Sequence, residues 1–178
     1  MKSAVFSTAR EAFQVAHVSY AGPVREIPSE SRKGDSSHSF KMITSLGMAW
    51  CYYRSEESAR KARGALGAML ASVKSRLFSC QGESIDPHAV VSFTSVYELK
   101  EPHENKTHAF TVSLRIAEGK NPRLCLQFTS VEAARKARGA LWAMIDAVNG
   151  IEGSEPCDAR NNEPSGEPCA TPEGDLPF

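Results

Sequence analysis

Long apolar runs are missing from this 178-residue sequence. No segment reaches the roughly 20 consecutive apolar residues of a membrane-spanning helix. The first residues, Met1 to Phe6, also lack the apolar stretch of a secretory signal peptide. We therefore expect a cytoplasmic protein. Its 41% of apolar residues is enough to build a hydrophobic core.

Motifs of metal sites, disulfide frameworks and common enzymes are missing as well. The five cysteines are odd in number and form no C-x-x-C pair, so we predict free thiols. The histidines show no ligand spacing on a common helix, and no P-loop, H-E-x-x-H or G-x-S-x-G motif occurs. These absences predict no bound metal, no cofactor, no catalytic residue and no enzymatic activity.

The sequence has no excess of charge of either sign, since its formal net charge is zero. The acidic and basic residues are, however, unevenly distributed along the chain. Residues 151–178 contain seven acidic residues and one basic residue, a net charge of −6. The other 150 residues then hold 20 basic and 14 acidic residues, a net charge of +6. A basic body predicts a polyanionic partner, and an acidic tail predicts a separate task for that tail. The alternative is a tail that only aids solubility.

An internal repeat organises the body. Residues 55–69 align with residues 130–144 at an offset of 75 and share the run Ala-Arg-Lys-Ala-Arg-Gly-Ala-Leu-x-Ala-Met. Apolar residues recur there at steps of three, four and seven, which predicts one amphipathic helix in each copy. Ser55 before two glutamates, and a capping box at Thr129-x-x-Glu132, predict the helix starts. Gly82 and Gly150 predict the ends.

Alternating apolar residues predict strands before each helix. Leu124, Leu126 and Phe128 would face the core in the second copy, and Trp50 and Tyr52 would face outward in the first. Each copy is expected to be strand, strand, strand, helix, with a fourth strand as an alternative inside a long bent first segment. The expected strands lie in 13–24, 40–46 and 48–53, and in 90–100, 110–116 and 123–128.

The predicted fold class is α+β, with antiparallel sheets, two long helices and an internal duplication. We assign residues 1–82 to the first repeat and 83–150 to the second, which together form one compact domain. Residues 151–178 mix acids with Gly, Ser, Pro and Asn and are predicted to be a disordered tail. An OB-fold is not expected, because an OB barrel does not contain two strand-rich units each closed by a long helix.

Basic residues recur in both helices and in the loops beside the strands, and we interpret them as a nucleic-acid surface. Single-strand binding combines such cations with aromatic rings on which bases stack. The alternatives are a solvated helix surface for the cations and core packing for the rings; core packing is favoured for Phe93 and Tyr97. The candidate residues are Trp50, Tyr52, Arg32, Lys33, Lys41, Arg54, Arg60, Lys61, Arg63, Lys106, Arg115, Lys120, Arg123, Arg135, Lys136 and Arg138.

A glycine lies on the outer side of each predicted helix, at Gly64 and Gly139. Glycine inside a helix is unfavourable by about 1 kcal/mol relative to alanine, so its presence in both copies predicts a close contact. The partner would be the other repeat's helix or a second subunit. We accordingly expect a homo-oligomer; the alternative is that a recent duplication simply copied the glycine.

The chain ends in Asp175-Leu176-Pro177-Phe178 and the free carboxylate. This tip resembles the tail of the bacterial single-stranded DNA-binding protein (SSB) family, in which an acidic run is followed by an aliphatic residue, Pro and Phe. The resemblance implies that these four residues dock into a hydrophobic pocket with a basic rim on replication, repair and recombination proteins. The body looks more like the Whirly and PUR type of duplicated sheet-plus-helix nucleic-acid binders.

These observations predict a largely sequence-independent single-stranded DNA-binding protein that acts in replication, recombination or repair and recruits partners through its tail. A mobile element or a phage is one conceivable source. The alternatives are an RNA-binding or regulatory protein of the same architecture, and a protein-interaction adaptor with a PH-like sheet and helix.

Overall fold

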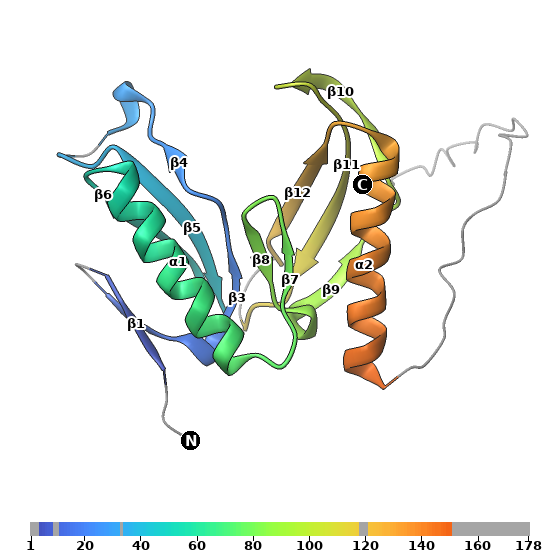
Figure 1. The fold of residues 1–178 in the computed structure, drawn as a ribbon, viewed down its shortest axis with the longest axis horizontal. Helices are drawn as coiled ribbons and strands as arrows, with labels where there is room; N and C mark the ends of the chain where they lie inside the picture. The colour runs from blue at the N-terminus through green and yellow to red at the C-terminus, as the bar shows by residue number, and fades with distance from the viewer. Residues whose placement is uncertain (1–3, 9–10, 33, 118–120, 151–178) are drawn as a thin grey trace, which may run out of the picture.

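The computed structural model describes residues 4–8, 11–32, 34–117 and 121–150. It is an α+β fold with antiparallel sheets and two long helices, which confirms the predicted class (Figure 1). The predicted disordered tail, 151–178, lies outside the described residues. No helix within the described ranges is long and apolar enough to cross a membrane.

The first sheet has six strands. They are β3 (Val18–Ala21), β4 (Arg25–Glu26), β5 (His38–Thr44), β6 (Gly47–Tyr53), β7 (Phe78–Cys80) and β8 (Glu83–Ile85). β5 has β6 on one side and both β3 and β4 on the other, so β3 and β4 are two parts of one bent first strand. β3 also pairs with β8, and β8 pairs with β7.

The second sheet has four strands and the same order of pairing. They are β9 (Val90–Phe93), β10 (Tyr97–His103), β11 (Lys106–Leu114) and β12 (Arg123–Phe128). β11 has β12 on one side and both β9 and β10 on the other. The divided first strand that the sequence offered as an alternative is therefore present in both halves.

Short elements that the sequence analysis did not predict complete the first half. The hairpin β7–β8 turns at Gln81 and Gly82, both with positive φ, and it spans the boundary predicted between 82 and 83. A second hairpin stands at the N-terminus. The further elements are β1 (Val5–Ser7), β2 (Ala12–Gln14) and the 3-10 helices η1 (Val15–His17), η2 (Ser29–Ser31) and η3 (Pro87–Ala89).

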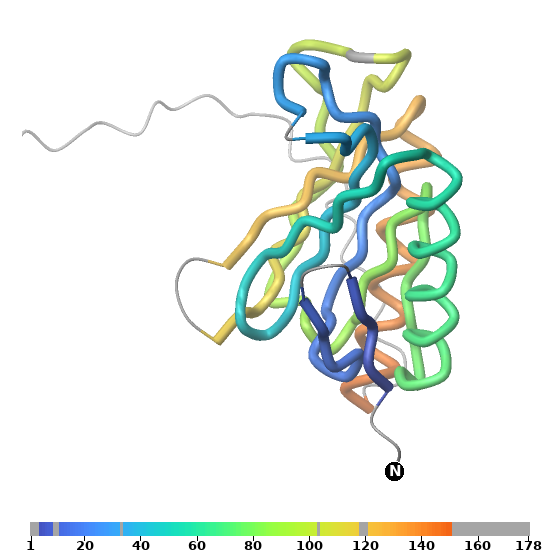
Figure 2. Tube along the Cα trace, turned by 90° about the vertical axis from the view of Figure 1, so that its left-hand side faces the viewer, coloured from blue at the N-terminus to red at the C-terminus, as the bar shows by residue number. Residues whose placement is uncertain are grey.

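The helices are α1 (Glu56–Val73) and α2 (Val131–Asn149), and both lie on the same side of the strands (Figure 2). A serine hydroxyl caps each helix by accepting a hydrogen bond from the third residue beyond it. Ser55 accepts from the Ser58 amide at 3.2 Å, and Ser130 accepts from the Ala133 amide at 3.1 Å. The predicted start at Ser55 is confirmed.

Two predicted helix boundaries are wrong. The cap of α2 is Ser130 rather than Thr129, because the Ser130 hydroxyl is the group that reaches the free amides of the first turn. α1 ends at Val73 and not near Gly82, which instead forms the β7–β8 turn. Gly150 ends α2 in the left-handed conformation, as predicted.

The hydrophobic core has two parts. One lies beneath α1, where Leu66 and Leu70 pack on Phe40 and Met42 of β5. The other joins the two halves, because side chains of the first sheet enter the core of the second. These side chains are Tyr20, Ile43, Phe78 and Ile85. The two sheets are thus held together by buried apolar contacts.

Candidate nucleic-acid interface

A groove lies between the halves, where β12 faces the first sheet. One cavity of about 260 Å³ is lined by Tyr20, Lys41 and Trp50 of the first sheet and by Arg123 and Cys125 of β12. Alternation along β12 sends Leu124, Leu126 and Phe128 into the core, so the intervening residues face the groove.

A second cavity of about 270 Å³ continues the groove toward the β7–β8 hairpin. It is lined by Cys80 and Gln81 of the hairpin region, by Lys106 and by Gln127. Four residues line both cavities, which makes them adjoining parts of one groove: Pro23, Arg25, Glu83 and Cys125. We call this surface the interhalf groove.

Four cations from both halves line the interhalf groove: Arg25, Lys41, Lys106 and Arg123. None of them forms an ion pair with another described residue. Arg25 and Arg123 are exposed, and Lys41 and Lys106 are half-buried. Glu83 is the acidic residue that lines the same cavities, so the groove has an excess of positive charge, which is what a phosphate backbone requires.

Two exposed aromatic rings lie on β6, and one of them, Trp50, lines the groove. Trp50 is 50% exposed and Tyr52 is 48% exposed, so the predicted outward phase of this strand is confirmed. Lys41 lies directly across the strand pair from Trp50. A stacking surface and a cation are thus neighbours on one sheet face, the combination that single-strand binding uses.

Glu83 is the only acidic residue among those that line the two cavities. Its Oε2 atom is buried and has no hydrogen-bond partner among the described residues. Burial raises the pKa of its carboxyl group, while a hydrogen bond with the Tyr20 side chain and the charges of Arg25 and Lys106 act in the opposite direction. Burial also raises the pKa of the Tyr20 hydroxyl group, and the charge of the neighbouring Glu83 raises it further.

Arg63, a predicted binding residue, ties α1 to the bend of the first strand. Its Nε donates to the Gly22 carbonyl at 2.8 Å. Its Nη2 donates to the Ala21 carbonyl at 2.9 Å, the Gly82 carbonyl at 3.0 Å and the Ser84 hydroxyl at 2.7 Å. These bonds occupy the guanidinium within the chain, so its evident role is structural.

Arg138 makes the corresponding contact in the second half. Its Nε donates to the Thr94 carbonyl at 2.9 Å, at the bend between β9 and β10. Its guanidinium lies 5.1 Å from the centre of the Phe93 ring and 5.6 Å from that of Trp142. Phe93 packs edge-on against Trp142, whereas Tyr97, also expected in the core, is 38% exposed.

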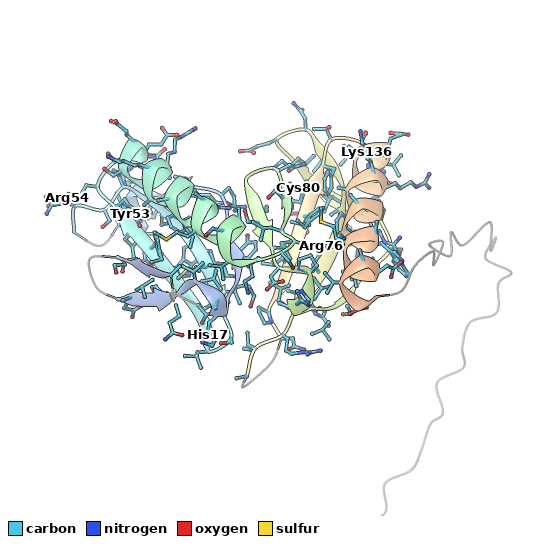
Figure 3. The ribbon with its side chains drawn as sticks, turned by 60° about the horizontal axis from the view of Figure 1, so that its bottom comes forward. His17, Tyr53, Arg54, Arg76, Cys80 and Lys136 are labelled. Atoms are coloured by element: carbon cyan, nitrogen blue, oxygen red, sulfur yellow. The ribbon has the colours of Figure 1, made fainter. Side chains whose placement is uncertain are left out.

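The other predicted cations do not gather at the groove. Arg32 pairs with Glu26, Arg54 with Asp35 and Arg60 with Glu56, at 2.8, 3.5 and 2.6 Å. Figure 3 places Arg54 and Lys136 at opposite ends of the molecule, with Cys80 between the halves. Lys61, Arg115, Arg135 and Lys136 are exposed outside the groove. Lys33, Lys120 and the tail residues Asp175, Leu176, Pro177 and Phe178 lie outside the described residues.

The contact predicted at the helix glycines is absent within the described part of the chain. A Cβ atom added at Gly64 or Gly139 would meet no heavy atom within 4 Å. The two helices therefore do not touch there, and a contact through the other repeat is excluded. Contact with a second subunit stays a prediction.

Sequence reasoning missed two charged residues of the groove, Arg25 and Glu83. Arg25 differs from the predicted loop cations only by its place on a two-residue strand. Glu83 and Tyr20 meet because β8 pairs with β3, where Tyr20 lies opposite Ile85. Since the β7–β8 hairpin was not predicted, nothing in the sequence placed them together.

Comparison with known proteins finds no match to this chain among family models, curated proteins or solved structures. Within the described ranges, no group of three or more His, Cys, Asp or Glu side chains is placed to hold a metal ion.

Proposed function

We propose that the protein binds single-stranded DNA in the interhalf groove, largely without regard to sequence, and acts in replication, recombination or repair. The observation behind this proposal is the set of four cations that form no ion pair with a described residue, in a groove lined by the exposed ring of Trp50. The phosphates would lie along the cations, and bases would stack on the rings.

We further propose that the body arose by internal duplication and is not an OB barrel. The equivalent contacts of the two halves support this. The Gly22 amide donates to the Lys41 carbonyl, and the Thr94 amide donates to the Thr111 carbonyl at the same place of the second half. The arginine of each repeat binds the carbonyl of that bend residue.

The tail would recruit partner proteins. Its tip, Asp175 to Phe178, offers an aromatic anchor, a carboxylate and an acidic residue, which together make a compact recognition unit. By its resemblance to the SSB family, it would dock on replication, repair and recombination proteins. Removal of Phe178 should abolish such docking and leave DNA binding intact.

Fluorescence anisotropy of labelled poly-dT, poly-U and duplex DNA over a salt series tests the proposal. The full chain and a chain ending at Gly150 should both prefer poly-dT, with affinity that falls steeply as salt rises. Lys41→Gln and Arg123→Gln should each lower the salt slope by about one. Lys136→Gln, on the far helix, is the matched control and should change little.

Failure to bind any of these nucleic acids at low salt would refute the proposal and favour a protein-interaction adaptor. Tighter binding to poly-U than to poly-dT would favour the RNA-binding alternative. A slope that responds equally to Lys136→Gln and Arg123→Gln would place the binding surface outside the groove.

A further inference from the structure

One acid stands in a groove whose other charged residues are all basic, and that acid has an unused oxygen. Glu83 lines both cavities with Arg25, yet it forms no ion pair within the described chain. Its Oε2 atom accepts no hydrogen bond from any residue that the structure describes. Buried polar atoms are nearly always paired, so an unpaired one calls for an explanation such as a ligand.

The contacts around Glu83 fix its place among the residues that line the groove. It follows the positive-φ turn at Gln81 and Gly82, and the Gly82 carbonyl is tied to Arg63. The Tyr20 side chain hydrogen-bonds the Glu83 carboxyl group from β3. Rotation about the last side-chain bond is soft for Glu, so either oxygen can turn toward the cavity without moving the backbone.

Trp50 lines the same cavity of about 260 Å³ as Tyr20 and Glu83. A base stacked on an exposed Trp50 ring at the mouth presents its hydrogen-bonding edge to the groove. The polar side chains of that cavity include the hydrogen-bonded pair Glu83 and Tyr20 and three cations. The cations are Arg25, Lys41 and Arg123.

We infer that Glu83 reads the edge of one nucleobase in this cavity and selects bases that present an amino group over thymine and uracil. This inference rests on the proposed function. A carboxylate only accepts hydrogen bonds. The exocyclic amine of cytosine donates to it, whereas thymine and uracil place a carbonyl oxygen at that position and would leave the Glu83 Oε2 atom unpaired.

The selection is local to one base, so it refines a largely sequence-independent binder and does not replace that description. Phosphate contacts position the strand, and a single base contact adds a preference. The reading side chain lies on the hairpin between the halves, and the second half has no described acid at this groove to repeat it.

The test compares oligo-dC with oligo-dU of equal length, because these bases differ at the position where cytosine has an amine and uracil has an oxygen. Anisotropy at one fixed salt concentration should show that the full-length protein binds oligo-dC at least about fivefold more tightly, the effect of one hydrogen bond. Glu83→Gln, which exchanges one acceptor for a donor, should abolish or reverse this ratio and leave oligo-dU binding unchanged or tighter.

Glu57→Gln is the matched control, because it removes the same charge from the exposed start of α1 and should keep the ratio. Tyr20→Phe removes the hydroxyl that orients Glu83 and should lower the ratio only in part. Circular dichroism and an unchanged salt slope on oligo-dU verify that each variant folds and still binds.

Equal, salt-dependent affinity of the wild-type chain for both oligonucleotides overturns this inference and leaves the proposed function intact. A ratio that survives in Glu83→Gln also overturns it. Absence of binding to either oligonucleotide at low salt overturns the proposed function and this inference together.

Discussion

The two halves of the chain have the same strand order but turn different side chains toward the groove between them. β6 presents Trp50 and Tyr52, and the corresponding positions of β12 are Cys125 and Gln127. The positions that face the helices stay apolar in both strands, with Cys51 opposite Phe40 and Leu126 opposite Phe110. The comparison teaches that two sheets with the same pairing and similar core positions can present different outward residues.

The division of labour follows from this difference. The first half brings the exposed ring of Trp50 and two cations to the groove, and the second half brings the cations Lys106 and Arg123 without an exposed ring from β12. Stacking is therefore expected to depend on the first half, while the electrostatic term draws on both.

The largest expected effect is a difference in stability between variants of the two structural arginines, Arg63 and Arg138. Arg63→Ala leaves three carbonyls and the Ser84 hydroxyl without their donor, so we expect a loss of about 3–5 kcal/mol in unfolding free energy. Arg138→Ala removes one such bond and two ring contacts and should lose about 1–2 kcal/mol.

Urea unfolding measures both losses, with Arg60→Ala as the control. Arg60 forms only an exposed pair with Glu56, so its replacement should change the unfolding free energy by less than about 1 kcal/mol. Equal losses at Arg63 and Arg138 would show that the two ties are equivalent after all.

The second effect concerns stacking. Trp50→Ala should weaken binding of single-stranded DNA by about 1–3 kcal/mol, because it removes the most exposed ring at the groove. Cys125→Ala, at the corresponding position of β12, should leave the affinity within about twofold. Anisotropy titrations with poly-dT measure both, and comparable losses would place stacking in both halves.

The third effect is a pH dependence of folding stability, which arises from Glu83 in the groove rather than from either helix. Burial raises the pKa of Glu83, so the folded chain keeps this proton to a higher pH than the unfolded chain. The resulting stability is complete below about pH 4, the ordinary range of the carboxyl group, and is lost as pH rises through the raised pKa.

Glu83→Gln does not titrate, so its stability relative to the wild type should increase over that same rise in pH. Thermal unfolding of both proteins from acid to neutral pH measures the difference. A difference that is constant with pH would contradict the assigned environment of Glu83.

The smallest effect concerns Gly64 and Gly139, the glycines at corresponding positions of the two helices that no described contact explains. Gly64→Ala and Gly139→Ala should each stabilise the isolated chain by about 0.5–1 kcal/mol, since nothing lies where the new methyl group would go. Destabilisation together with a lower oligomeric state in sedimentation would instead place a second subunit on these helices.

Periodicity was sufficient to predict the regular elements. Two patterns are local in the sequence: the alternation at Leu124, Leu126 and Phe128, and the spacing of three and four residues in both helices. The structure confirms both. The β7–β8 hairpin was missed because its strands have three residues each, too few for a period to show.

The roles of single side chains were harder to predict, because they depend on residues distant in sequence. Arg63 and Arg60 look alike in the helix, yet one reaches the carbonyl of Gly22 and the other stays with its neighbour Glu56. Of the sixteen cations and rings proposed for binding, those at the groove are Lys41, Trp50, Lys106 and Arg123.

The pairing of β8 with β3 also limits how early the first sheet can be completed during synthesis. Tyr20 opposes Ile85 in that pairing, and Arg63 reaches Gly82 and Ser84. The first sheet therefore cannot close until residue 85 has left the ribosome, after the whole of α1 has been made. A nascent chain truncated within the β7–β8 hairpin would lack these contacts, although it already contains every residue of the first helix.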